Sequence, residues 1–146
     1  KIKTNGNTIF IKGPNKLISV KNIKTKEFPG IPTDLQAQLM VLMCRSIGNS
    51  SITENIFENR FLHVGELQRL GAKIRIKNNK ATIQGNTKFI GAELMSSDLR
   101  ASVALVLAAM VSRGKSIINR IYHLDRGYED IEKKLRRIGV RIKRLK

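Results

Sequence analysis

The sequence has little of what several protein classes require. Its 146 residues include one cysteine, Cys44, and two histidines, so they cannot build a disulfide framework or a cysteine-rich metal site. The longest apolar stretch, Ala101 to Val111, is about half as long as a bilayer-spanning helix. We therefore expect no metal, no membrane span and a reducing compartment. The chain starts at Lys1 without an initiator Met or a signal-like segment, which predicts a piece cut from a longer polypeptide.

Acidic residues are also scarce. The chain carries 28 Lys and Arg against 11 Asp and Glu, a formal net charge of +17. Such an excess is typical of proteins that neutralise phosphates, and residues 133–146 contain basic but no acidic side chains. However, the seven aromatics are scattered, and no zinc-finger, RRM or helix-turn-helix signature is present.

The basic C-terminal stretch also has the pattern of ordinary secondary structure. Apolar residues occur first at helical spacing and then in strand-like alternation, at Ile131, Leu135, Ile138, Val140 and Ile142. Its charges then lie on solvated faces, and we expect no specific nucleic-acid partner. The alternative is a basic nucleic-acid-binding or structural module without catalysis.

Turn signals divide the chain into short elements. Asn5-Gly6 predicts a hairpin, Phe28-Pro29-Gly30-Ile31-Pro32 a rigid loop, and Gly71 the end of a helix over about 62–70. Thr33 is expected to cap a further helix, with Gln36 completing a capping box and Gly48 ending it. The predicted strands are residues 1–3, 8–12, around 17–19, 51–54, 72–77 and 80–84.

Part of the sequence repeats. Residues 34–37 (DLQA) are echoed by 98–101 (DLRA), and 70–74 (LGAKI) by 138–142 (IGVRI), so the offset drifts from 64 to 68. Self-similarity of this kind predicts a supersecondary unit that occurs nearly twice. The segment Val103–Val111 is apolar on every side, and Leu39–Met43 nearly so, which predicts helices surrounded by protein. We expect an α/β fold with buried helices and outer sheets.

Two acids begin the two apolar helices. Asp34 and Asp98 occupy equivalent first-turn positions, where free backbone N–H groups favour a carboxylate. Capping is the more common role for either residue. Asp34 is harder to explain in this way, because Thr33 is already available as the cap and the rigid loop before it is suited to presenting a side chain to a ligand.

Two loops carry arginine, whose guanidinium suits carboxylate or phosphate. We expect Arg60 to pair with Glu58 or another neighbour as a structural clamp, whereas the residues alone leave the role of Arg126 open. The remaining candidates are expected to have structural roles. His63 and His123 are expected to cap or pack, and Cys44 to be a buried small hydrophobe, because no nucleophile–base constellation accompanies them.

Four segments in order resemble the C-terminal part of the UDP-N-acetylglucosamine enolpyruvyltransferases. They are Phe28–Gln38 (FPGIPTDLQAQ), Thr53–His63 (TENIFENRFLH), Ser97–Ser102 (SDLRAS) and Tyr122–Glu129 (YHLDRGYE). The resemblance implies a lobe of the EPSP synthase-like fold, an inside-out α/β barrel of βαβαββ units. It also implies that 1–146 is a partial C-terminal lobe, with units at about 1–85 and 86–146, and that the N-terminal lobe is absent.

The resemblance also implies roles for individual residues. Asp34 matches the base that takes the proton of the sugar 3-hydroxyl, and Ile56 and Phe57 match contacts to the sugar nucleotide. Arg126 matches an arginine that pairs with phosphoenolpyruvate, and Asp98 and Arg100 match a pair near the reacting centre. The implied partners are UDP-N-acetylglucosamine, phosphoenolpyruvate and the N-terminal lobe, in the bacterial cytoplasm and with no cofactor. The family's reactive Cys and other phosphoenolpyruvate-binding residues fall outside this chain, so we expect the chain alone to be inactive.

Overall fold

The computed structural model describes residues 1–145. It confirms the α/β class. One sheet has the order β3-β4-β6-β5, and two smaller ones pair β1 with β2 and β7 with β8. The strands are β1 (Ile2–Asn5), β2 (Thr8–Ile11), β3 (Ile23–Lys24), β4 (Asn49–Thr53), β5 (Lys73–Lys77), β6 (Lys80–Gln84), β7 (Glu93–Met95) and β8 (Ile117–Asn119). The helices are η1 (Thr33–Leu35, a 3-10 turn), α1 (Gln36–Arg45), α2 (His63–Arg69), α3 (Leu99–Met110), α4 (Tyr122–Asp125) and α5 (Ile131–Arg137).

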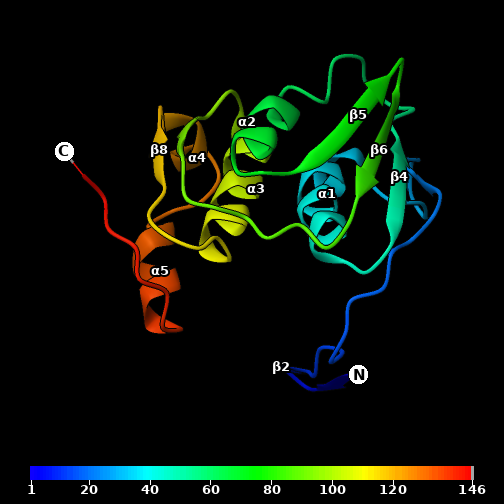
Figure 1. Ribbon diagram of the computed structural model, residues 1–146. Helices are drawn as coiled ribbons and strands as arrows, with labels where there is room; N and C mark the ends of the chain where they lie inside the picture. Colours follow the sequence, from blue (N-terminus) through cyan, green and yellow to red (C-terminus); the bar gives the residue numbers. More distant parts are fainter. Residues whose placement is uncertain (146) are drawn as a thin grey trace.

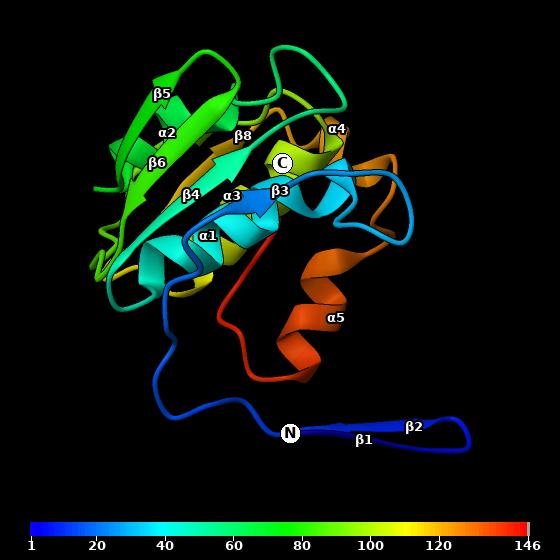
Figure 2. The same cartoon turned by 90° about the vertical axis from the view of Figure 1, so that its right-hand side faces the viewer.

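Helices occupy the middle of the molecule. Figure 1 shows α1 between the β4–β6–β5 sheet and α3, and β8 and α4 on the far side of α3. Figure 2 shows the sheet from its outer side, with β3, β4, β6 and β5 next to one another. Helices α1 and α3 thus lie inside and the strand pairs outside, as the apolar patterns of these two helices predict. Closure of these layers into a barrel stays a prediction.

The two central helices each connect a pair of parallel strands. Helix α1 lies between β3 and β4 in the chain, and α3 lies between β7 and β8, and both strand pairs are parallel. Parallel neighbours need such a crossover because the chain must return to the same end of the sheet. The division into units at 1–85 and 86–146 stays a prediction.

The core is continuous from the sheet through α1 and α2 to α3. Its fully buried members include Met40 on α1, Ile52 on β4, Leu67 on α2 and Leu105 on α3. Burial of one such side chain contributes about 2 kcal/mol. A second cluster joins α3 to α4 and α5, so α3 is packed on two opposite sides.

Four local predictions are wrong. The expected strand at 17–19 is a single bridge between Ile18 and Ile47, and Val140 and Ile142 lie in a segment without regular structure. A strand exists only where a partner completes its hydrogen-bond ladder, and alternation does not supply one. Helix α3 is not enclosed on every side, because Leu107 and Met110 are more than a third exposed.

The fourth error concerns the start of α1. Thr33 lies in η1, and α1 has no side-chain cap, so the capping box with Gln36 does not form. The hydroxyl of Thr33 instead donates to Glu54 Oε2 at 3.0 Å. The hairpin β1–β2, the turn at Gly71 and the pair β5–β6 are all confirmed. The hairpin extends away from the body of the molecule (Figure 2).

Candidate functional site

Asp34 and Arg100 come together across a separation of 66 residues. Asp34 lies in η1, directly after the proline loop, and Arg100 lies in the first turn of α3. Arg100 Nε donates to Asp34 Oδ1 at 2.6 Å. The pair is partly open to water, because the Asp34 side chain is 60% exposed and that of Arg100 39% exposed. The pair therefore lies at the surface, where a carboxylate can reach a bound molecule.

Asp98 has the capping role that the sequence offers for it. Its Oδ1 accepts the backbone N–H groups of Arg100 at 2.9 Å and Ala101 at 3.0 Å at the start of α3. Burial raises the pKa of Asp98, but the N–H of Ala101, the hydroxyl of Ser97 and the N–H of Arg100 outweigh it, so that the pKa lies below its usual value. The two acids are thus not equivalent: Asp98 is engaged with its own helix, whereas Asp34 faces α3.

Ile56 and Phe57 lie in the loop between β4 and α2. Their backbone N–H groups both donate to Glu54 Oε1, at 2.9 and 3.2 Å. The Phe57 ring is 54% exposed, and the guanidinium carbon of Arg60 lies 4.5 Å from its centre. Arg60 therefore acts as a clamp, as expected, but its partner is this ring and not Glu58. An open hollow of about 440 Å³ adjoins Phe57, Arg60, Leu62 and Ile76, among other residues.

Arg126 lies at the end of α4 and is exposed. The next residue, Gly127, packs against the first residue of α3: a Cβ at Gly127 would stand 3.0 Å from both terminal carbons of Leu99. This close approach holds Arg126 at the same end of α3 as Arg100. No hydrogen bond or ion pair within the described residues 1–145 engages the Arg126 guanidinium, which leaves it available to an anion.

A small cavity of about 30 Å³ lies behind the Asp34–Arg100 pair. Its lining includes Gln36, His63, Asp98 and Arg100. His63 is 3% exposed and Gln36 2% exposed. Burial lowers the pKa of His63 to about 4, against the smaller opposing effects of the Asp98 charge and the Arg60 backbone carbonyl. The imidazole is therefore neutral at pH 7, and its packed position confirms the expectation for His63.

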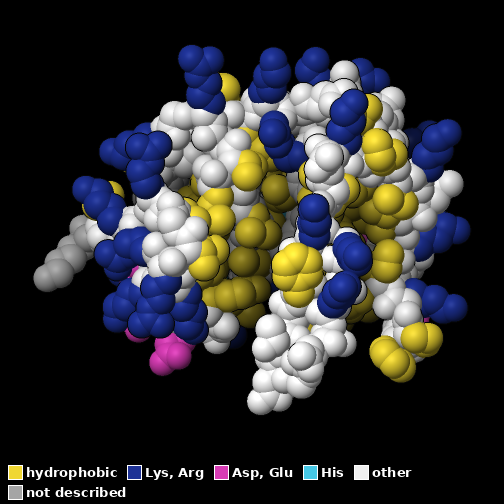
Figure 3. All heavy atoms as spheres, turned by 90° about the horizontal axis from the view of Figure 1, so that it is seen from below, with side chains coloured by type: hydrophobic (Ala, Val, Ile, Leu, Met, Phe, Trp, Pro, Cys, Tyr) yellow, Lys and Arg dark blue, Asp and Glu magenta, His cyan; other side chains and the backbone are white. Residues whose placement is uncertain are grey.

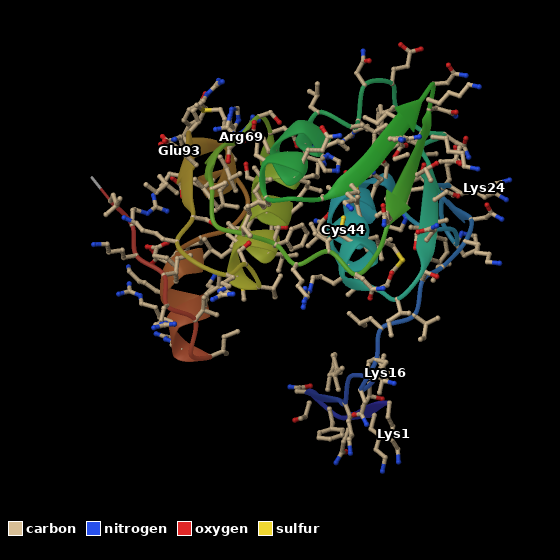
Figure 4. The ribbon with its side chains drawn as sticks, viewed as in Figure 1. Lys1, Lys16, Lys24, Cys44, Arg69 and Glu93 are labelled. Carbon is tan, nitrogen blue, oxygen red and sulfur yellow. The ribbon has the colours of Figure 1, made fainter. Side chains whose placement is uncertain are left out.

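The other two unassigned residues are also accounted for. His123 lies against Tyr122, with ring centres 4.2 Å apart, so it packs as expected. Cys44 lies on the buried side of α1 (Figure 4), and burial raises the pKa of its thiol to about 12. A thiol of this kind is neutral and enclosed, which excludes a nucleophilic role.

The sequence did not single out Glu54. This carboxylate is 3% exposed and accepts hydrogen bonds from two side chains as well as from the loop that holds Ile56 and Phe57. The one signal for it is an acid directly after a predicted strand, a common pattern that does not distinguish burial from solvent exposure. Within residues 1–145, no helix is both long enough and apolar enough to cross a bilayer.

The comparisons with known proteins agree with this architecture. Residues 1–135 match the family described as EPSP synthase (3-phosphoshikimate 1-carboxyvinyltransferase). The chain belongs to the EPSP synthase family. The matched residues include all four segments on which the resemblance rests.

Three similar curated proteins have the same name. The chain is 61% identical over 145 residues to the UDP-N-acetylglucosamine 1-carboxyvinyltransferase of Pelagibacter ubique. The aligned part is 99% of this chain and 34% of that protein. The protein of that name from Geotalea daltonii is 56% identical, over 95% of this chain and 33% of its own length. The one from Helicobacter pylori is 55% identical, over 91% of this chain and 32% of its own length. The chain thus spans about a third of the length of these relatives.

Solved structures show the same fold. The enolpyruvyl transferase NikO from Streptomyces tendae superposes with a TM-score of 0.89 at 26% identity, over 98% of this chain and 33% of that one. EPSP synthase from Acinetobacter baumannii gives a TM-score of 0.67 at 13% identity, over 99% of this chain and 34% of that one. The chain therefore has the enolpyruvyltransferase fold over nearly its whole length.

Proposed function

We propose that this chain is part of a UDP-N-acetylglucosamine 1-carboxyvinyltransferase. The longer protein transfers the enolpyruvyl group of phosphoenolpyruvate to the 3-hydroxyl of UDP-N-acetylglucosamine and releases phosphate, the first committed step of peptidoglycan synthesis. The observation that carries this proposal is the 61% identity, over 99% of the chain, to a protein of that name. It acts in the bacterial cytoplasm without a cofactor, and its product serves the growth of the cell wall, on which cell shape and division depend.

In this reaction Asp34 is the base. The sugar O3 forms a bond to C2 of phosphoenolpyruvate while its proton passes to the carboxylate, and C3 takes up a proton from a general acid of the longer protein as the C2=C3 π bond breaks. The tetrahedral intermediate then loses a proton from C3 to a base and expels phosphate, which restores the double bond. The Asp34 side chain is 60% exposed, and the hydrogen bond from Arg100 ends on Oδ1. Oδ2 is thus able to accept the proton of a bound hydroxyl, as a general base must.

Arg100 and Asp98 support this base. Arg100 fixes the orientation of the Asp34 carboxylate through the 2.6 Å bond, and Asp98 fixes the first turn of α3 from which Arg100 extends. The three residues thus form one connected unit at the end of α3. A carboxylate held in this way needs little reorganisation when the hydroxyl arrives.

The remaining contacts hold the two substrates in place. Ile56 and Phe57 contact the sugar nucleotide through backbone and ring, since this backbone is held in place and the ring is 54% exposed. Arg126 binds the carboxylate or phosphate of phosphoenolpyruvate, which suits an exposed guanidinium. The net charge of +17 favours the capture of two anionic substrates. The N-terminal lobe of the longer protein supplies the rest of the site.

The test uses the longer protein that contains this segment. Phosphate release is measured with UDP-N-acetylglucosamine and phosphoenolpyruvate, for the wild type and for Asp34→Asn. Removing the base is expected to lower kcat by about a hundredfold or more. Asp130→Asn is the control, because Asp130 is an exposed acid paired with Lys133. Wild-type protein without turnover, or full activity in Asp34→Asn, would overturn the proposal.

The 146-residue chain alone provides a second test. It is expected to show no phosphate release, because the residues that complete the site belong to other parts of the longer protein. Turnover by the isolated chain that is lost in Asp34→Ala would contradict this expectation.

A further inference from the structure

Glu54 is a buried carboxylate without a cation. It is 3% exposed, and in the described part of the chain, residues 1–145, no Lys, Arg or His nitrogen lies within 4.0 Å of it. Burial of a charge is costly unless hydrogen bonds replace the lost water. Four neutral donors do so here. Oε1 accepts from Thr25 Oγ1 at 2.9 Å and from the N–H groups of Ile56 and Phe57, and Oε2 accepts from Thr33 Oγ1 at 3.0 Å.

These donors come from separate segments of the chain. Thr25 follows β3, Thr33 begins η1, and Ile56 and Phe57 follow β4. The backbone of Glu54 is fixed as well, since its N–H donates to the Asn79 carbonyl at 2.8 Å and its carbonyl accepts from Asn79 Nδ2 at 3.1 Å. The parallel pair β3–β4 and the bonds of Asn55 to Thr25 hold the starts of these two loops together. The carboxylate adds the link to Thr33, beyond the end of the sheet.

Both loops carry residues of the proposed site. One holds Asp34 directly after Thr33, and the other holds Ile56 and Phe57. We propose that Glu54 is a positioning residue of the sugar-nucleotide site, which sets the Asp34 loop and the Ile56–Phe57 loop in one fixed arrangement. This inference rests on the function proposed above. It assigns Glu54 no contact with either substrate.

The geometry separates two substitutions of similar size. In Glu54→Gln the amide oxygen can take the place of Oε1 and accept the same three donors, while the amide nitrogen faces the Thr33 hydroxyl, which can turn and accept. In Glu54→Met no acceptor of comparable strength remains, and the N–H groups of Ile56 and Phe57 lose their partner. Gln should therefore preserve the arrangement that Met disrupts.

The experiment measures kcat and both KM values in the longer protein that contains this segment. Glu54→Met is expected to raise the KM for UDP-N-acetylglucosamine about tenfold or more, with a much smaller change in the KM for phosphoenolpyruvate. Glu54→Gln is expected to stay within about threefold of the wild type. A purely structural role would lower the amount of active enzyme, and thus kcat, without changing the ratio of the two KM values.

Thr33→Val keeps the inference testable if Glu54→Met does not fold. It removes one donor beside Asp34, and we expect the KM for UDP-N-acetylglucosamine to rise about threefold to tenfold relative to the KM for phosphoenolpyruvate, with the protein still folded. Thr82→Val, on the exposed side of β6, is the matched control and should leave kcat and both KM values unchanged. Equal changes in both KM values, or a Thr33→Val variant that behaves like Thr82→Val, would overturn the role of Glu54.

The two proposals fail in different ways. If the wild-type longer protein does not turn over the two substrates, the proposed function is wrong. If it does so and depends on Asp34, but the Glu54 and Thr33 variants match the control, the proposed function stands and the positioning role alone is wrong.

Discussion

His63 should make the stability of this protein depend on pH in a range where most side chains do not titrate. The side chain is 3% exposed and lies beside the cavity at the start of α3. Burial lowers its pKa from 6.5 to about 4, although the charge of Asp98 and the carbonyl of Arg60 favour the protonated form.

The direction and size of the effect follow from proton linkage. Between pH 6.5 and about 4 the unfolded chain binds a proton at this histidine and the folded chain does not. The free energy of unfolding is therefore at its full value above pH 6.5 and falls as the pH decreases through this range. At about 1.4 kcal/mol per pH unit, the interval corresponds to about 3 kcal/mol.

Two measurements test the effect on the 146-residue chain. The chain has only two histidines, so the imidazole protons of His63 and His123 can be followed by NMR across a pH titration. Urea unfolding at about pH 7.5 and about pH 5 should show a loss of about 2 kcal/mol in the wild type, and a much smaller loss in His63→Gln. His123→Gln serves as the control and should retain the wild-type pH dependence.

The reasoning fails under either of two results. One is a His63 resonance that titrates near 6.5, the ordinary value, in the folded protein. The other is an equal pH dependence of unfolding in the wild type and in His63→Gln.

Three further predictions concern the core, the cap of α3 and the charge. Ile52→Ala should lower the free energy of unfolding in urea titrations by about 2–5 kcal/mol, because Ile52 is fully buried in β4. Ile9→Ala, on the exposed hairpin, is the control and should change this free energy by less than about 0.5 kcal/mol. Asp98→Ala should destabilise by about 1 kcal/mol and Asp98→Asn by less. Since the pKa of Asp98 is lowered, this stabilisation is present above pH 3.8 and is lost as the pH falls through the folded pKa, which unfolding at a series of pH values would show. Binding to duplex and single-stranded DNA should be weak, non-selective and steeply reduced by salt in anisotropy titrations, and a sequence preference that survives at high salt would instead favour a nucleic-acid-binding module.

The basic surface has a simple arrangement. Figure 3 shows hydrophobic side chains gathered in the middle of one face, with Lys and Arg around its edge. Some C-terminal cations are already paired, since Lys133 bonds Asp130 at 2.8 Å and Arg144 bonds Asp125 at 2.6 Å. The positive charge is thus spread over the surface, as the alternation of apolar and basic residues predicts.

The sequence by itself determined the features that depend on a few neighbouring residues. Asn5-Gly6 makes the hairpin and Gly71 ends α2, because each supplies a backbone conformation that the turn requires. The apolar pattern of α1 and α3 likewise predicts central helices, since it specifies which faces must be buried. The predicted helix starts and the arginine-bearing loops placed Asp34, Asp98 and Arg126 among the candidates, and the resemblance of the four segments implied their roles.

Only the tertiary structure decided which side chains meet. The ion pair of Asp34 and Arg100 joins residues 66 apart, and Glu54 collects donors from segments up to 29 residues away. The same long-range contacts explain the errors: Thr33 bonds Glu54 instead of capping α1, and the segment around Val140 alternates like a strand but has no neighbouring strand to pair with. Local patterns fix what a residue can do, whereas its partner depends on the packing of the whole chain.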